Sequence, residues 1–241
     1  MEKFKLILGP CAIESREHSL KMVDSLLNIV SQFDVDFYYK SSFDKANRTK
    51  GSSLRGVGLE EGSDILQEIR EKGVKTLTDV HETYQCSRLI NSVDILQIPA
   101  FLCRQTDLIS EAAKYKPVNI KKGQFLSPYD MKNVIDKVDS EVWITERGTT
   151  FGYNDLVVDF RGVPIMREWG KPVIFDATHS VQSPGVGGQK QFVEPLAKAA
   201  YAIGVDGLFM EVHDDPENAI SDSSTQIHIN DLKNILKSIG L

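Results

Sequence analysis

A cluster of lysines and arginines stands out in a chain that is otherwise acidic. The 241 residues carry 28 Lys and Arg against 34 Asp and Glu, which gives a formal net charge of −6. One polar stretch nevertheless concentrates five cations: Lys40, Lys45, Arg48, Lys50 and Arg55. Three more close later apolar runs: Lys121, Lys122 and Arg147. Arginine binds phosphate or carboxylate through paired hydrogen bonds, and lysine adds a point charge. The pattern therefore predicts an anion-binding pocket, with a solvated basic loop as the alternative.

Four residues that are far apart in the sequence have side chains that could bind a metal ion together. They are Cys11, His179, Glu211 and Asp222. Thiolate, imidazole and carboxylate ligands suit Zn²⁺, Fe²⁺ or another divalent first-row ion. Each residue taken singly has an ordinary explanation, since a lone Cys is usually a small buried apolar side chain and a lone His a hydrogen-bonded one. Their spacing alone does not show a site.

Short apolar runs alternate with amphipathic stretches along the whole chain. The sequence predicts eight strands, over residues 6–11, 36–41, 75–79, 95–99, 118–122, 142–147, 172–177 and 207–212. Apolar residues at helical spacing fill the intervals, as with Leu232, Leu236 and Ile239, and Gly204 follows one such stretch as a helix cap does. Eight strand–helix units predict an α/β fold, a (β/α)₈ TIM barrel in a single domain over residues 1–241. A doubly wound open sheet is the alternative.

Polar or reactive side chains lie where these predicted strands end. They are Cys11, Lys40, Asp79, Gln97, Lys121, Arg147, His179 and Glu211. Barrel enzymes place their chemistry at the C-terminal ends of the strands, so eight such residues in register predict a polar funnel. Two long polar loops, residues 42–62 and 180–191, follow strands and are candidate lids at the same face.

The composition excludes several classes of protein. With 41% hydrophobic and 26% charged residues, the chain has the profile of an ordinary globular protein. No apolar run reaches the ~18 residues of a membrane span, and the first eight residues lack the core of a signal peptide. The acidic balance argues against a nucleic-acid-binding protein. Three scattered cysteines indicate reduced thiols and a cytoplasmic location.

Eight ordered motifs make the sequence resemble the 3-deoxy-D-manno-octulosonate 8-phosphate synthase family over essentially its whole length. The motifs are GPCAIES (9–15), KSSFDKANR (40–48), TDVHE (78–82), QIPAFLCRQ (97–105), NIKKGQ (119–124), ERGTTFG (146–152), DATH (176–179) and MEVH (210–213). The resemblance implies a TIM barrel, typically a homotetramer. It implies an enzyme that condenses phosphoenolpyruvate with D-arabinose 5-phosphate and water, releasing phosphate, in lipopolysaccharide (Kdo) biosynthesis.

The resemblance also implies roles for single residues. Phosphoenolpyruvate, which carries a carboxylate and a phosphate on adjacent atoms, needs several cations close together. Its implied site is Lys45, Gln97, Lys121, Gln124 and Arg147. The implied arabinose 5-phosphate site is Lys40, Asn47, Arg48 and Thr49, with Arg48 on the phosphate. The implied catalytic residues are Lys40, Lys45, Lys121, His179 and Asp222. No organic cofactor is implied.

The family has metal-requiring and metal-independent branches, and this chain resembles the first. The metal-independent branch carries Asn where this sequence has Cys11, and residues 221–226 (SDSSTQ) also resemble the metal-requiring branch. The resemblance therefore implies that Cys11, His179, Glu211 and Asp222 bind Zn, Fe, Mn or a similar divalent ion. Such an ion could polarise the aldehyde, orient the sugar or activate water, and the sequence does not choose among these.

Two rival functions stay open. A 3-deoxy-arabino-heptulosonate 7-phosphate synthase uses erythrose 4-phosphate and usually carries Lys-Pro-Arg-Thr where this chain reads KANRT (45–49), so the added amide of Asn47 favours the longer sugar. A barrel that binds sugar phosphates without catalysis would be expected to lack some strand-end residues, and none is missing here. His81 and His213 also follow strands, and either a place in the site or a structural role is open for them.

Overall fold

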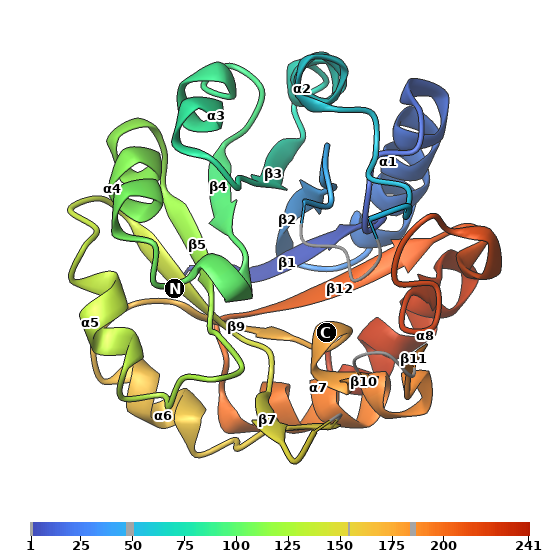
Figure 1. Ribbon diagram of the computed structural model, residues 1–241. Helices are drawn as coiled ribbons and strands as arrows, with labels where there is room; N and C mark the ends of the chain where they lie inside the picture. Colours follow the sequence, from blue (N-terminus) through green and yellow to red (C-terminus); the bar gives the residue numbers. More distant parts are fainter. Residues whose placement is uncertain (1, 47–50, 154, 184–186) are drawn as a thin grey trace.

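The computed structural model describes residues 2–46, 51–153, 155–183 and 187–241. Eight parallel strands form a closed ring with helices around it (Figure 1). The ring consists of β1 (Phe4–Gly9), β2 (Val35–Lys40), β3 (Lys75–Asp79), β4 (Ile95–Ile98), β5 (Val118–Lys121), β6 (Val142–Glu146), β9 (Val173–Asp176) and β12 (Gly207–His213). Neighbours in this order pair in parallel, and β12 pairs with β1. The predicted (β/α)₈ barrel is confirmed, and the open sheet is excluded.

The α-helices cover the outside of this ring. They are α1 (Arg16–Val30), α2 (Leu59–Glu71), α3 (Thr83–Arg88), α4 (Thr106–Tyr115), α5 (Met131–Ile135), α6 (Gly162–Arg167), α7 (Val193–Ile203) and α8 (Ile229–Ile239). Their apolar faces turn inward, and in α8 the side chains of Leu232, Leu236 and Ile239 are buried as their spacing predicted. Helix α7 ends at Gly204, whose φ of 89° is a left-handed conformation that glycine adopts without steric cost. No helix within the described ranges is long and apolar enough to cross a membrane.

The predicted boundaries of the ring strands lie within two residues of the observed ones, and β1 departs most, because it begins and ends two residues earlier than predicted. It ends at Gly9, two residues before Cys11. A β-carbon at Gly9 would lie 2.1 Å from the Lys40 carbonyl oxygen, so only glycine lets the chain pass β2 at this distance. Cys11 therefore lies in the loop after β1, where its carbonyl oxygen accepts a hydrogen bond from Ser42 N at 3.2 Å.

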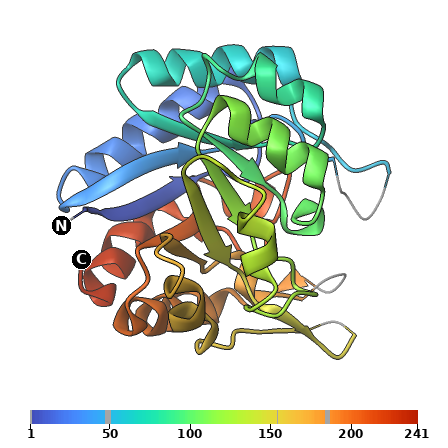
Figure 2. The same ribbon diagram turned by 90° about the vertical axis from the view of Figure 1, so that its left-hand side faces the viewer.

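Several short elements outside the ring were missed by the prediction of eight strands. The strands are β7 (Thr149–Phe151), β8 (Asp155–Val157), β10 (Gln182–Ser183), β11 (Gly187–Gly188) and β13 (Ile227–His228), and the 3₁₀ helices are η1 (Ala100–Leu102), η2 (His179–Val181), η3 (Lys190–Phe192) and η4 (Pro216–Asn218). Strands β7 and β8 form an antiparallel hairpin at the rim, in the yellow segment at the lower edge of Figure 2. The residues of this hairpin are exposed or half-buried, so no apolar alternation marks it in the sequence.

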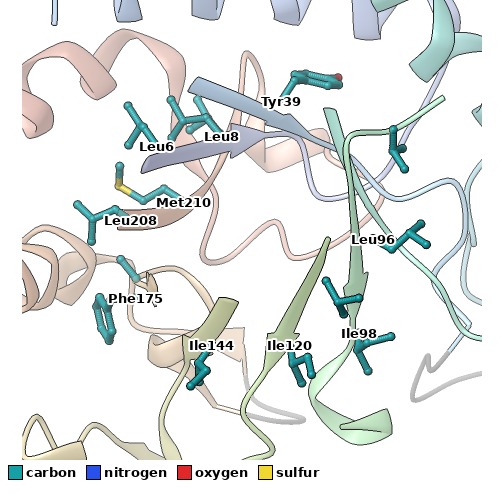
Figure 3. Close-up of a cluster of buried hydrophobic side chains, with 14 of the residues drawn as sticks. Leu6, Leu8, Tyr39, Leu96, Ile98, Ile120, Ile144, Phe175, Leu208 and Met210 are labelled. Atoms are coloured by element: carbon teal, nitrogen blue, oxygen red, sulfur yellow. The ribbon is translucent and has the colours of Figure 1, made fainter. Parts of the chain in front are cut away.

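The pleat of the strands explains where the polar layer lies. Large side chains form an apolar layer inside the ring: Ile7, Tyr38, Leu77, Ile95, Trp143, Ile174 and Phe209. Two residues further along the same strands stand Gly9, Lys40, Asp79, Gln97, Thr145, Asp176 and Glu211. Intervening residues such as Leu8, Ile144 and Phe175 point outward into the packing between strands and helices (Figure 3). Since residues i and i+2 of a strand share a face, the polar layer lies directly above the apolar one.

Candidate active site

A cavity of about 520 Å³ opens at the C-terminal ends of the strands. Its lining includes eight residues that were predicted from the sequence: Lys40, Lys45, Gln97, Lys121, Gln124, Arg147, His179 and Asp222. The other two predicted metal ligands that the structure describes, Cys11 and Glu211, are fully buried. Asn47, Arg48 and Thr49, predicted for the sugar phosphate, lie outside the described residues. The volume is in the range of small-molecule sites.

Two members of the predicted cationic cluster do not line the cavity. Arg55 Nε donates to Asp44 Oδ1 at 2.7 Å in an exposed ion pair. Lys122 is buried, and its Nζ donates to Thr149 Oγ1 at 3.0 Å. Successive side chains of an extended chain face opposite sides, and Lys121 takes the inward position, so Lys122 faces the outer loops. The expectation that both cations would serve the anion pocket was wrong.

Lys40 connects two buried carboxylates across the ring. Its Nζ lies 3.4 Å from Glu211 Oε1 and 3.6 Å from Asp79 Oδ2, and it donates to the Cys11 carbonyl oxygen at 3.2 Å. Burial alone would raise the pKa of Asp79, but Lys40 and Lys45 hold it well below its usual range. Burial alone would lower the pKa of Lys45, but the neighbouring Cys11 and Glu211 groups raise it. Asp79 therefore stays ionised at neutral pH, and Lys45 keeps its positive charge at the cavity wall.

Asp176 holds two of the predicted catalytic side chains in place. It forms a buried ion pair with Lys121, whose ammonium lies 3.4 Å from the centre of the Phe209 ring. Its Oδ2 also lies 2.7 Å from His179 Nδ1, and its Oδ1 accepts from His179 N at 2.9 Å. Burial alone would raise the pKa of Asp176, but His179 and Lys121 hold it well below its usual range. The sequence prediction had not assigned Asp176, although its place two residues after inward-facing Ile174 would have indicated it.

Arg147 offers an unused donor to the cavity. Its Nη2 donates to Gln182 Oε1 at 3.0 Å, while its Nη1 is buried and has no hydrogen-bond partner among the described residues. Gln124 Oε1, an acceptor on the wall of the same cavity, is also buried and has no hydrogen-bond partner among the described residues. Buried polar groups are nearly always hydrogen-bonded in native proteins. A guanidinium nitrogen left over at a cavity is therefore matched to an anionic group of a ligand.

The Gln97 amide is part of a network of buried polar side chains that crosses four strands. Thr145 Oγ1 donates to Asn119 Oδ1 at 2.6 Å, and Asn119 Nδ2 donates to Gln97 Oε1 at 2.8 Å. Gln97 Nε2 in turn donates to Asp79 Oδ1 at 2.5 Å. Gln97 lines the cavity, as predicted, but its carbonyl oxygen is occupied by a neighbour. It therefore contributes a fixed wall and one remaining N–H rather than a free amide.

The fold brings the predicted metal ligands together. Ligand atoms of Cys11, Glu211 and Asp222 lie within 4.8 Å of one another. The fourth, His179, lies with Nε2 at 3.6 Å from Glu211 Oε1, and its Nδ1 faces Asp176. Glu211 Oε2 is buried and has no hydrogen-bond partner among the described residues. A thiol, an imidazole and two carboxylates around an unsatisfied carboxylate oxygen fit a divalent first-row ion.

The buried thiol indicates how such a site would be charged. Burial and the carboxylates of Asp222 and Glu211 raise the pKa of Cys11 well above its usual range. In the arrangement described, Cys11 Sγ accordingly donates to Asp222 Oδ2 at 2.8 Å. Binding of a cation would displace this proton, because thiolate is the ligand form of cysteine.

Comparison with known proteins places the chain among enzymes of one kind. The profile of the DAHP synthetase I family matches residues 2–240. The chain is 53% identical to the 2-dehydro-3-deoxyphosphooctonate aldolase of Bartonella henselae, over 98% of this chain and 88% of that protein. It is 51% identical to the protein of the same name from a Cyanothece species, over 99% of this chain and 91% of that protein. A Synechococcus protein of the same name is 53% identical over 96% of this chain.

Proposed function

The chain belongs to the DAHP synthetase I family, and on that premise we propose that it is a 3-deoxy-D-manno-octulosonate 8-phosphate synthase. This enzyme condenses phosphoenolpyruvate with D-arabinose 5-phosphate and water, releases phosphate, and acts in Kdo biosynthesis. The name 2-dehydro-3-deoxyphosphooctonate aldolase, which the relatives carry, denotes the same reaction. The observation that carries the proposal is the convergence of Lys40, Lys45, Lys121 and Arg147 on one cavity. Two phosphorylated substrates require such a concentration of positive charge.

The reaction forms one C–C bond and one C–O bond, the latter to water, and it breaks the C–O bond to phosphate. C3 of the enol phosphate attacks the aldehyde carbon of the open-chain sugar, and positive charge develops at C2. Water adds at C2, and the resulting hemiketal phosphate expels inorganic phosphate. No Schiff base is required, so the lysines act as fixed cations and proton donors. Cations that are already in place within a buried site stabilise the negative charge that forms on the aldehyde oxygen and on the departing phosphate, without further reorganisation.

The proposed substrate contacts follow from the positions of the charges. Lys45, Lys121 and Arg147 bind the carboxylate and phosphate of phosphoenolpyruvate, and Gln97 and Gln124 form the neutral wall of that subsite. The sugar phosphate is assigned to Lys40 and to the segment that begins beyond Lys45: Asn47, Arg48 and Thr49. The cavity supports the first group directly, because its members line one space.

We assign Cys11, His179, Glu211 and Asp222 as ligands of a divalent first-row ion. When bound, the ion supplies Lewis-acid chemistry of the kind that polarises a carbonyl or lowers the pKa of water. Asp176 orients His179 through Nδ1 and leaves Nε2 to face Glu211. Lys40 Nζ lies 3.4 Å from the same Glu211 oxygen, Oε1, and balances the charge of that carboxylate.

The choice of sugar phosphate tests the assigned function. We expect phosphate release with D-arabinose 5-phosphate to exceed that with erythrose 4-phosphate by at least tenfold in kcat/KM, because the amide of Asn47 suits the longer sugar. Phosphate release is measured for each aldehyde with phosphoenolpyruvate held saturating. Preference for erythrose 4-phosphate would reassign the enzyme within its family, and no turnover with either sugar in the presence of Mn²⁺ or Zn²⁺ would indicate a binding protein.

Removal of metal tests the ligand assignment. Treatment with dipicolinate followed by gel filtration is expected to reduce phosphate release to a few per cent, and added Mn²⁺, Zn²⁺ or Fe²⁺ is expected to restore it. The reason is that the thiol and carboxylates of the site are arranged for a cation that the chelator removes. Metal content measured alongside the activity distinguishes loss of the ion from denaturation. Full activity in protein that contains no metal would contradict the assignment.

We further propose that the protein is a cytoplasmic homotetramer. All three cysteines are free, which supports a reducing compartment. Large aromatic side chains are exposed on the loops that follow the neighbouring strands β4, β5 and β6: Phe101, Phe125, Tyr129, Phe151 and Tyr153. Thr150 N donates to Gln124 O at 2.9 Å and holds β7 against the loop after β5. Apolar exposure concentrated on one part of the rim is typical of a protein interface.

Sedimentation equilibrium tests the assembly. We expect four copies in the wild type and a smaller species in the double variant Phe151→Ser, Tyr153→Ser, with unchanged far-ultraviolet circular dichroism. Replacing two exposed rings by small polar groups removes apolar area from the contact while leaving the core intact. A monomeric wild type at micromolar concentration would contradict the proposed assembly.

A further inference from the structure

Glu14 lies at the junction of three segments that carry proposed metal ligands. Its Oε1 accepts hydrogen bonds from His213 Nε2 at 3.2 Å and from Ile220 N at 3.1 Å. Glu14 follows Cys11 by three residues, His213 follows Glu211 by two, and Ile220 precedes Asp222 by two. One carboxylate oxygen therefore ties together the loop after β1, the end of β12 and the segment that follows it.

The hydrogen bonds around His213 determine which of its ring nitrogens carries the proton. His213 Nδ1 accepts from Asp215 N at 2.9 Å, so in the neutral ring the proton is on Nε2, which faces Glu14. Glu14, His18 and His213 have ligand atoms within 4.8 Å of one another and resemble a second metal site. In this arrangement, however, His213 Nε2 has no free lone pair, and His18 Nε2 is 2.9 Å from Asp214 Oδ1. Glu14, His18 and His213 are therefore arranged as a hydrogen-bonded group that supports the neighbouring segments, and not as a second metal site.

The Asp222 segment needs such a support, because its backbone is strained. Asp222 has a φ of 50°, and it is the only residue other than glycine with positive φ in the described part of the chain. A conformation of this kind persists where the surrounding contacts hold it. On one side, Gln226 Nε2 donates to Ser221 O at 2.8 Å, and its Oε1 accepts from Cys11 N at 3.4 Å. On the other side, Glu14 holds the segment by accepting a hydrogen bond from Ile220 N.

We infer that Glu14 is a positioning residue, whose carboxylate holds the Cys11 loop against the Asp222 segment so that thiol and carboxylate lie at ligand distance before a cation arrives. The inference rests on the metal centre proposed above. It assigns no contact between Glu14 and substrate, since Glu14 does not line the cavity. Outer residues that orient metal ligands contribute about 10- to 100-fold to metal affinity.

Binding of Co²⁺ to metal-stripped protein tests this role. The ligand-to-metal band of a cobalt thiolate in the near ultraviolet reports Cys11 ligation directly, and competition with a chelator gives the dissociation constant. We expect Glu14→Ala to weaken Co²⁺ binding by about 10- to 100-fold and to reduce the thiolate band at subsaturating Co²⁺. Glu14→Gln keeps an acceptor oxygen for both N–H groups and is expected to stay within a few fold of wild type. The matched control is Glu17→Ala, an exposed glutamate three residues later.

The outcomes separate the inference from the proposed metal centre. If the wild type shows no cobalt–thiolate band, the metal centre itself is wrong. If the wild type binds Co²⁺ and Glu14→Ala binds it equally well, the role of Glu14 is overturned. Should Glu14→Ala fail to fold, Glu14→Asp makes the same test, because it keeps the charge but shortens the reach by one methylene. Equal affinity in that folded variant would likewise overturn the inference.

Discussion

Replacement of Arg147 by alanine is expected to lower kcat/KM for phosphoenolpyruvate by about 100- to 1,000-fold. The guanidinium is buried at the cavity with Nη1 unpaired among the described residues, so its remaining hydrogen-bonding capacity is available to the ligand. A preorganised donor that faces developing charge in a site without bulk water contributes on this scale. Steady-state kinetics with each substrate varied in turn measures the effect.

Two further variants make the result for Arg147 specific. Arg147→Lys keeps the positive charge but loses the planar guanidinium with its paired donors. We expect its kcat/KM for phosphoenolpyruvate to lie between those of the wild type and the alanine variant. Arg161→Ala is the matched control, because Arg161 is exposed and, in the part of the chain that the structure describes, forms an ion pair only with nearby Asp159, with Nη2 2.8 Å from Oδ2. Its kinetics are expected to match the wild type. If Arg147→Ala kept kcat/KM within threefold of wild type, the assignment of Arg147 to phosphoenolpyruvate would be wrong.

The second large effect is on stability. Asp176→Asn is expected to lower the free energy of unfolding by about 3 kcal/mol at neutral pH, because it leaves the Lys121 ammonium buried without a counter-charge. Urea denaturation followed by circular dichroism measures the change. Lys121→Met removes the other partner and is also expected to destabilise. The double variant is expected to be more stable than the sum of the two single changes predicts, since an apolar replacement leaves no unpaired charge.

The loss of stability caused by Asp176→Asn is also expected to depend on pH in a defined direction. Burial lowers the pKa of Lys121 in the folded protein, and loss of Asp176, which opposes that effect, lowers it further. Between the folded and the unfolded pKa of Lys121, the unfolded chain binds more protons, so stability rises with pH in that interval. The difference in the free energy of unfolding between the variant and the wild type is therefore expected to become smaller as the pH is raised toward 10. A gap that widened on the alkaline side would show that the loss does not come from the buried ammonium.

The amino-acid sequence by itself predicted the eight strands of the ring and many of the polar residues that line the cavity. Lys40, Gln97 and Lys121 each end an apolar run, and the two-residue period of a strand places such residues on the inner face above buried apolar side chains. The same local information led to Gly204 as a helix end. Propensity and periodicity are properties of neighbouring residues, so they can be read along the chain without knowledge of the fold.

Only the tertiary structure decided which distant groups meet. Closure of the ring sets β1 beside β12, and this brings the Cys11 thiol to the Asp222 carboxylate across 211 residues of sequence. The tertiary structure also places Lys121, and not Lys122, at the cavity, and it brings Lys121 and His179 to Asp176. Spacing along the chain carries no record of these contacts, because they depend on how sheet closure and side-chain packing place each strand end. The exposed β7–β8 hairpin escaped prediction for a related reason: with little of its surface buried, it leaves no apolar pattern in the sequence.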